Sequence, residues 1–429
     1  MISLINNTEY NNIRLKKIGG LLTGIWKNPN VIDTLNSFPL PKTFNFSSVF
    51  SDFEKFVGLD VKPMSYHLCG YGTFFNESIC GFLGESVERY SFASLYKEIG
   101  NAVCHYSINE IKNLKEEAIF DLNYLNIFSD NNKNNLQLDE KISWIKMNYL
   151  NDYSKKLYVP LQFFVSATDE MIRGEKRFLN SAVSTGTACQ ESFFKALEAA
   201  IIEIEQIDSF NLWWYGGLEG KDIKVNICDF LEKYFSDNLT NNNFVRNFEV
   251  VFTDISFDKN LDVVVCEIFS KNKKLILPKY TVGVQGAKNM SKAIYRSFME
   301  ALAVLSFNFN YPWIYPEKYK NVKENQILDN LDVNITWYSK FGKPNKVKHN
   351  KKVEFLGNKD YDLIKDICKF GKTGFMNISL PEFESLNLAV ARVVNPALLS
   401  ICIPSYPTEN HPRYKEFGGI LNFIPHPLA

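Results

Sequence analysis

Several features are missing from this 429-residue sequence, and each absence removes a class of function. Lysine plus arginine and aspartate plus glutamate number 48 each, so the chain lacks the basic excess expected of a protein that binds nucleic acid or an anionic membrane. No apolar run approaches the roughly 18 residues that a membrane span needs. The first residues also lack the charged and apolar regions of a secretory signal peptide, so we expect a cytoplasmic protein.

Metal-binding and phosphate-binding motifs are absent as well. The eight cysteines are scattered without a C-x-x-C pair, and the five histidines do not recur at metal-ligating intervals. We expect the cysteines to be small buried hydrophobes in a reducing compartment. Gly371, Lys372 and Thr373 could end a phosphate-binding loop, but Asp366 occupies the position of its first glycine. Any nucleotide site is therefore of another type.

The composition that is present indicates a folded protein with a substantial core. Apolar residues make up 45% of the chain and charged residues 22%. Segments typical of strands occur at residues 263–268, 274–277 and 390–394, and helical stretches alternate with them. The fold class is therefore predicted to be α/β or α+β.

The chain is long enough for more than one lobe. Pro39 and Pro41 mark a boundary, so we expect a loose N-terminal extension over residues 1–61 and a main domain over residues 62–429. Two asparagine-rich segments within that domain are expected to be surface loops, residues 130–135 and 239–243. The basic run at residues 346–352 is expected to be a solvated loop.

Three segments share a layout: a glycine turn, a polar step, and then a helix that carries a glutamate 16 or 17 positions after the glycine. The pairs are Gly72 with Glu88, Gly186 with Glu203, and Gly283 with Glu300. A layout that occurs three times predicts a recurring strand–turn–helix unit.

The helices of these units carry acidic residues close to apolar ones. Glu85 and Glu88 lie three residues apart and share a helix face, and Arg89 follows directly. Like charges at this spacing destabilise a helix unless something neutralises them. Carboxylates that converge from several helices would suit Mg²⁺, and arginine beside them would suit a phosphate. The alternative is that each glutamate faces water or pairs with a basic side chain.

Together these motifs resemble the YcaO superfamily. The resemblance is carried by G-E-S-V-E-R-Y-S-F at residues 84–92, S-T-G-T-A-C at 184–189, E-I-E-Q-I-D-S-F-N-L-W-W at 203–214 and A-I-Y-R-S-F-M-E at 293–300. It covers roughly residues 62–429, and the first two motifs together are the specific part. It implies a YcaO-like fold in which the recurring units surround a central nucleotide site.

The resemblance also implies an activity. Members of the family use ATP and Mg²⁺ to phosphorylate a backbone amide oxygen of a peptide. In the azoline-forming branch, a Cys, Ser or Thr side chain first attacks the amide carbon, and loss of the phosphorylated oxygen leaves a thiazoline or oxazoline. The substrate would be a ribosomally made precursor of the bacteriocin type.

Matching motif positions imply six cofactor-binding residues: Glu85, Glu88, Arg89, Ser192, Glu203 and Glu300. Of these, Glu85, Glu88 and Glu203 are implied to bind Mg²⁺.

The C-terminal sequence F-I-P-H-P-L-A resembles the P-x-P-x-P tail of azoline-forming members. In them the tail reaches into the active site, so Pro425, Pro427 and Ala429 are implied to take part in catalysis. Ala429 stands where the third proline would be. A short proline-containing tail has little conformational freedom to lose, which would help it to hold a terminal carboxylate in place.

Some positions depart from the family pattern, namely Gly81, Ala199, Gln206 and Ile207. They motivate two alternatives: a non-catalytic YcaO-like scaffold subunit of a peptide-modifying complex, and a thioamide-forming enzyme. For the cyclodehydratase, the expected partners are a precursor peptide and a separate protein that binds its leader. A dehydrogenase subunit and a homodimer are left open.

Overall fold

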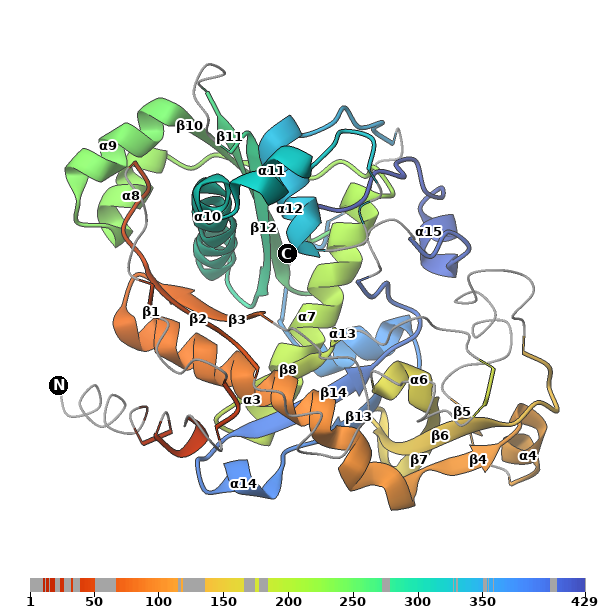
Figure 1. Cartoon of the computed structure of the whole chain (residues 1–429). Coiled ribbons are helices and arrows are strands. Elements are labelled where there is room, and N and C mark those ends of the chain that lie inside the picture. The colour runs from red at the N-terminus through yellow and green to blue at the C-terminus, as the bar shows by residue number, and fades with distance from the viewer. Residues whose placement is uncertain are drawn as a thin grey trace.

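The computed structural model describes most of the chain. The described residues are 11, 13–14, 16–19, 24–26, 32–33, 39–50, 67–114, 117–118, 136–165, 174–176, 184–271, 278–326, 328, 331–349, 353, 355–357, 359–401 and 407–428. Helices and strands are mixed throughout (Figure 1), which confirms the predicted fold class.

The largest sheet has seven strands and collects segments from distant parts of the sequence. Its order is β5-β7-β6-β13-β14-β8, and β4 pairs with β6. The strands are β4 (Cys104–Tyr106), β5 (Glu117–Ala118), β6 (Ile142–Tyr149), β7 (Asp152–Pro160), β8 (Thr187–Gln190), β13 (Gly374–Asn377) and β14 (Ala389–Val394). Because β8 pairs with β14, the segment at residues 184–190 lies beside a strand two hundred residues later in the chain.

A four-stranded antiparallel sheet has the order β12-β11-β10-β9. Its strands are β9 (Lys221–Ile223), β10 (Phe248–Asp254), β11 (Asp262–Ser270) and β12 (Tyr280–Ala287). The long helix α10 (Met290–Ile314) lies across this sheet, and α8 (Ile227–Tyr234) and α9 (Asn238–Asn247) pack beside it. Phe230 and Phe298 meet edge to face at 5.1 Å in the core between them.

The third sheet is β1 (Ile32–Asp33), β2 (Phe44–Val49) and β3 (His67–Gly72), with α3 (Phe75–Ile99) packed against it. β2 and β3 pair antiparallel over all six of their residues, and the Trp26 indole donates a hydrogen bond to Ser86 Oγ on α3 at 3.0 Å. The described part of the predicted 1–61 extension is therefore integrated into the fold. The division at residue 62 stays a prediction.

Helix α7 (Phe193–Trp214) is long and lies between the sheets, whereas the remaining helical elements are shorter. They are the 3₁₀ turn Gly100–Ala102, α4 (Ile108–Asn113), α6 (Leu161–Phe164), α11 (Pro316–Asn321), α12 (Leu331–Phe341), α13 (Leu363–Phe370), α14 (Pro381–Glu384) and α15 (Pro412–Glu416). None of the described helices is both long and apolar enough to cross a membrane.

The recurring strand–turn–helix unit is confirmed: β3 leads into α3, β8 into α7, and β12 into α10. The glycines hold different places in the units. Gly186 lies in a turn, as predicted, with a φ of +85°, but this turn precedes β8. The predicted glycine turn is wrong at Gly283, which lies inside β12. A Cβ at Gly283 would stand 2.3 Å from the carbonyl oxygen of Ser297. The glycine there allows strand and helix to pack closely, and the turn follows the strand.

Several local predictions are also decided by the structure. The segments at 263–268 and 390–394 are strands, as expected, within β11 and β14. The expected loop at 239–243 is wrong, because these residues belong to α9. The Asp237 side chain caps that helix by accepting from the Thr240 amide at 3.2 Å. The segments at 130–135 and 274–277 lie outside the described residues.

The cysteines do not all follow the expectation of burial. All seven described cysteines are free thiols. Cys189 and Cys266 are buried, whereas Cys69, Cys80 and Cys228 are exposed. Cys69, Cys80 and Cys189 line a common cavity, because the elements that carry them meet there.

Candidate functional site

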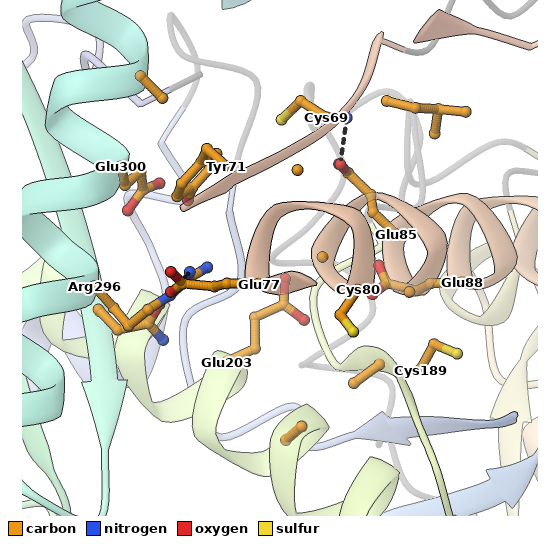
Figure 2. A pocket seen from close by; sticks show the side chains of 18 of the residues that line it. Cys69, Tyr71, Glu77, Cys80, Glu85, Glu88, Cys189, Glu203, Arg296 and Glu300 are labelled. Carbon is orange, nitrogen blue, oxygen red and sulfur yellow. Dashed lines mark hydrogen bonds and ion pairs between the residues drawn. The ribbon is translucent and has the colours of Figure 1, made fainter. Parts of the chain in front are cut away.

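A cavity of about 2000 Å³ lies where the three strand–turn–helix units meet. Each of the helices α3, α7 and α10 contributes glutamate and basic side chains to its wall, and Figure 2 shows those of Glu77, Glu203 and Arg296 converging from the three helices. Five of the six predicted cofactor-binding residues line it: Glu85, Glu88, Arg89, Glu203 and Glu300. Residues more than two hundred positions apart are thus brought to one site.

The same hydrogen bond orients one glutamate in each unit. Backbone amides at or near the strand donate to the helix carboxylates: Cys69 to Glu85 at 2.7 Å, Gly186 to Glu203 at 2.9 Å, and Val284 to Glu300 at 2.7 Å. The counterpart of Glu203 and Glu300 is therefore Glu85, not Glu88 as the sequence layout had indicated. A strand amide that holds each carboxylate fixes it toward the cavity before any ligand arrives.

The pKa values of three cavity glutamates are raised. Burial is the main cause for Glu88, and the neighbouring carboxylates of Glu203 and Glu85 add to it. Burial likewise raises the pKa of Glu203, and it raises that of Glu300 to about 7. A raised pKa means that the protein disfavours the ionised form. A cation bound beside these carboxylates would favour their ionised form.

Three arginines line this wall, and two of them, Arg89 and Arg296, lie beside its glutamates. Arg89 lies 3.8 Å from both Glu85 and Glu88 and is hydrogen-bonded to Ser184 Oγ. Arg296 donates to Glu77 Oε1 at 3.2 Å, and its guanidinium lies 5.1 Å from the ring centroid of Tyr71. Guanidinium groups held this way suit a phosphate, because they present several donors in a fixed plane.

Glu77 is a site residue that the sequence did not reveal. Its Oε2 accepts from the Thr73 amide at 3.1 Å and from the Tyr295 hydroxyl at 2.7 Å, and its Oε1 accepts from Arg296. A Cβ at Gly72 would stand 2.5 Å from the same carboxylate. Glu77 therefore joins the start of α3 to α10, and the glycine makes room for it.

Arg392 is a second residue that sequence reasoning missed, although its strand was predicted. It is buried beneath the 184–187 segment and donates to the Ser184 carbonyl at 3.2 Å, to Thr187 Oγ1 at 3.0 Å and to the Phe163 carbonyl at 2.9 Å. Burial lowers its pKa to about 10. Arg392 thus supports the segment whose Gly186 amide holds Glu203.

Ser192 is not brought to the cavity wall. It is the exposed N-cap residue of α7, and its side chain makes no capping hydrogen bond. Gln206, at one of the departing positions, does line the cavity, and its Oε1 accepts from the Gly286 amide at 2.7 Å. The Gln206 side chain therefore links α7 to β12, and it places a neutral amide, not a carboxylate, at this point of the wall.

The described part of the C-terminal tail reaches the cavity at Leu428. Leu428 lines the wall, and the Pro425 carbonyl accepts a hydrogen bond from the Tyr338 hydroxyl. The Trp214 indole donates to the Ile424 carbonyl at 2.8 Å, so the second residue of the tryptophan pair anchors the tail. Pro427 is buried beside Leu428, and Ala429 lies outside the described residues.

The residues present fit a magnesium–nucleotide group in charge and in kind. In the described part of the chain, no three His, Cys, Asp or Glu side chains form a ready-made metal site. Mg²⁺ is usually bound by one or two carboxylates and completes its octahedral shell with water and phosphate oxygens. Several carboxylates beside arginines suit that shared coordination, and the roles of Glu85, Glu88 and Glu203 in it stay a prediction.

Comparison with known proteins identifies this arrangement. No curated protein sequence matches the chain. A heterocyclase solved in complex with substrate and cofactor has a TM-score of 0.67 at 16% identity; the match covers 98% of this chain and 57% of the heterocyclase. This chain thus spans little more than half of that protein.

Two further structures share the fold. One belongs to the E. coli microcin synthetase McbBCD complex with pro-MccB17 bound (TM-score 0.62, 16% identity, 93% of this chain and 96% of the other). The other is YcaO from Methanopyrus kandleri bound with AMPPCP and Mg²⁺ (TM-score 0.52, 13% identity, 86% and 85%). The family model described as "YcaO cyclodehydratase, ATP- and Mg²⁺-binding" matches residues 69–399. The chain therefore belongs to the YcaO family of ATP- and Mg²⁺-binding cyclodehydratases.

Proposed function

We propose that this protein is a cyclodehydratase subunit that converts Cys, Ser or Thr residues of a ribosomally made precursor peptide into thiazolines or oxazolines. The observation that carries the proposal is the convergence of glutamates from three helices on one cavity that arginines also line. Such a wall is suited to a divalent cation that arrives together with an anionic nucleotide.

The bound ATP would supply the phosphoryl group that turns the amide oxygen into a leaving group, while Mg²⁺ offsets charge on the phosphates. The chain's own contribution is position. Glu85, Glu203 and Glu300 are aimed by strand amides, and Arg296 is aimed by Glu77. Groups that are oriented before binding lose little freedom on binding, which favours catalysis.

The tail is proposed to complete the site. Leu428 reaches the cavity wall, and hydrogen bonds to Ile424 and Pro425 hold the approach to it. Pro427 follows in the same buried segment. This placement supports the catalytic role that the resemblance implies for Pro425 and Pro427, and the same role for Ala429 stays a prediction.

Partner proteins are part of the proposal. The microcin synthetase chain that shares this fold is one component of the McbBCD complex, which was solved with pro-MccB17. By analogy, a separate protein would bind the leader of the precursor and present its core to this cavity. A dehydrogenase subunit would act afterwards if azoles are made.

One observation favours a second function, that of a non-catalytic scaffold subunit. Gln206 stands on the cavity wall where a further carboxylate would strengthen cation binding, and its oxygen is engaged by the Gly286 amide. A scaffold would keep the fold and the peptide surface but bind Mg-ATP weakly or not at all. A thioamide-forming enzyme would instead bind Mg-ATP as the cyclodehydratase does.

Calorimetric titration with Mg-ATP separates the enzyme from the scaffold. We expect Glu203→Gln to weaken binding by about tenfold or more, equivalent to about 1.4 kcal/mol. The matched control is Glu205→Gln on the same helix, because Glu205 is fully buried and does not line the cavity. Wild-type protein that binds no Mg-ATP, alone and with its co-encoded partners, would contradict the enzyme. Loss of one water from the precursor, detected by mass spectrometry, would distinguish azoline formation from thioamidation.

A further inference from the structure

The side of α10 that faces the cavity changes character along its length. Near the N-terminal end it carries Arg296 and Glu300, and small or aliphatic side chains follow. Beyond them are three aromatic rings, Phe307, Tyr311 and Tyr315, of which the last is the C-cap residue. We call these three residues the aromatic ladder. All of them line the same cavity as the glutamates.

The rings of the aromatic ladder form a continuous strip. They are spaced four residues apart, so they share one helix face. The ring centroids are 5.4 Å apart for Phe307 and Tyr311 and 5.3 Å apart for Tyr311 and Tyr315. Phe307 is 37% exposed and Tyr315 is 45% exposed. Apolar rings that face an open cavity offer a surface on which a ligand can bury its own apolar groups.

The dimensions of the strip fit a short stretch of peptide. At about 1.5 Å per residue, Phe307 lies roughly 10 Å along the helix from Glu300, and the ladder itself runs for about 12 Å. An extended peptide rises about 3.3 Å per residue, so the ladder spans about four residues. The charged end of the cavity and the ladder are therefore adjacent but separate along one helix.

We infer that the aromatic ladder binds apolar or aromatic side chains of the precursor peptide that flank the residue to be cyclised. This inference rests on the proposed function, because it places the peptide in the cavity that also holds the nucleotide. The continuity of the wall supports a peptide, since one ligand has to reach from the ladder to the charged end where its amide would react.

Charge at the outer end of the strip defines the occupant further. The Lys318 ammonium lies 4.7 Å from the ring centroid of Tyr315. A basic side chain of the peptide would be repelled there, whereas a neutral or acidic one would be accepted. The ladder thus selects peptides with apolar residues beside the Cys, Ser or Thr and without a basic residue at the outer end.

A matched control lies on the same helix. Trp313 is 76% exposed but does not line the cavity. A protein partner that covers the exposed end of α10 would contact Trp313 as well, whereas a peptide inside the cavity would not. Trp313→Ala therefore separates the two occupants.

The test measures binding of two fluorescein-labelled heptapeptides by anisotropy. One is Gly-Phe-Gly-Cys-Gly-Phe-Gly, and the other has serine in place of both phenylalanines. We expect the phenylalanine peptide to bind wild-type protein about tenfold more tightly. The double variant Phe307→Ala, Tyr315→Ala should remove that preference, while Trp313→Ala should keep it. Tyr315→Ser alone changes a half-exposed side chain and should reduce the preference even if the double variant folds poorly, which thermal denaturation would show.

Parallel titration with Mg-ATP keeps the two proposals distinguishable. We expect the ladder variants to bind Mg-ATP as the wild type does. Loss of Mg-ATP binding in those variants would show that the ladder holds the nucleobase, and it would overturn the inference. An equal loss in Trp313→Ala, or no preference between the peptides in the wild type, would overturn it too. If the wild type prefers the phenylalanine peptide but binds no Mg-ATP, the inference that the aromatic ladder binds peptide would be supported, and the proposed ATP-dependent activity would be contradicted.

Discussion

Helix α7 carries buried acids in two regions that are treated in opposite ways. Asp208, toward the interior, lies 2.7 Å from the Lys259 ammonium and 3.0 Å from the Arg413 guanidinium. Burial alone would raise its pKa, but these two cations lower it to about 2. Glu203, toward the cavity, accepts a backbone amide, and burial raises its pKa.

The difference separates an acid that stabilises the fold, Asp208, from an acid that we propose to bind a cation, Glu203. Asp208, Lys259, Arg413 and Asp258 neutralise one another inside the chain. We call these four residues the paired network. The cavity glutamates have arginines near them but keep raised pKa values, mainly because they are buried. Helix α7 thus carries one acid that is fully ion-paired within the chain, Asp208, and one whose pKa stays raised, Glu203.

The largest expected effect comes from breaking the paired network. Asp208→Ala removes the fully buried carboxylate that Lys259 and Arg413 share and leaves Asp258 alone to pair with both, so we expect the free energy of unfolding to fall by about 3–5 kcal/mol. Urea denaturation measures this loss. The control is Glu191→Ala, which breaks the exposed pair with Lys195 and should cost about 0–1 kcal/mol. A loss below about 1 kcal/mol for Asp208→Ala would remove the distinction between the two regions.

A smaller effect is expected at Glu205, another acid of α7. Its side chain is fully buried, and neither oxygen has a hydrogen-bond partner in the described part of the chain. Burial raises its pKa well above the usual value, and the nearby carboxylate of Asp366 adds to this, while Lys259 opposes it. The folded state therefore keeps the proton that the unfolded state releases.

The sign of the pH dependence follows from that proton. The stability contributed by protonated Glu205 is fully present below its ordinary pKa and is lost as pH rises toward the folded-state pKa. In that window the free energy of unfolding should fall by about 1.4 kcal/mol per pH unit relative to Glu205→Gln, which cannot ionise. Denaturation of both proteins from pH 5 to pH 8 measures the difference. If the free energy of unfolding depends on pH equally in both proteins, the pKa of Glu205 is not raised in the folded state.

Much of the site could be predicted from sequence because its acids lie in short local motifs. Glu85, Glu88 and Arg89 are adjacent on one helix, and the strand–helix units recur. Residues that act through distant contacts gave no such signal: Arg392 meets the 184–187 segment more than two hundred positions away, across a strand pair. Its motif is an ordinary strand with one arginine, and only the fold shows what the arginine holds.

The predicted solvent exposure of Lys346 is wrong for a similar reason. It belongs to a basic run that predicts solvent exposure, yet its ammonium lies 3.9 Å and 3.1 Å from the ring centroids of Trp213 and Trp214. Burial lowers its pKa well below the usual value. Composition describes the run as a whole, whereas the tertiary fold buries one member of it.

The smallest expected effect sharpens the comparison at the cavity itself. Glu77 is ion-paired within the chain, as Asp208 is, but its partner Arg296 lines the cavity. If Glu77 positions Arg296, then Glu77→Gln should weaken Mg-ATP binding by about threefold, because the guanidinium is still present but less well aimed. Glu198→Gln is the control, since Glu198 also lines the cavity but pairs with exposed Lys288. Equal weakening in both variants would mean that total cavity charge, not the aim of Arg296, governs binding. Weaker Mg-ATP binding by Glu77→Gln alone would show that Glu77 contributes to binding by orienting the Arg296 guanidinium.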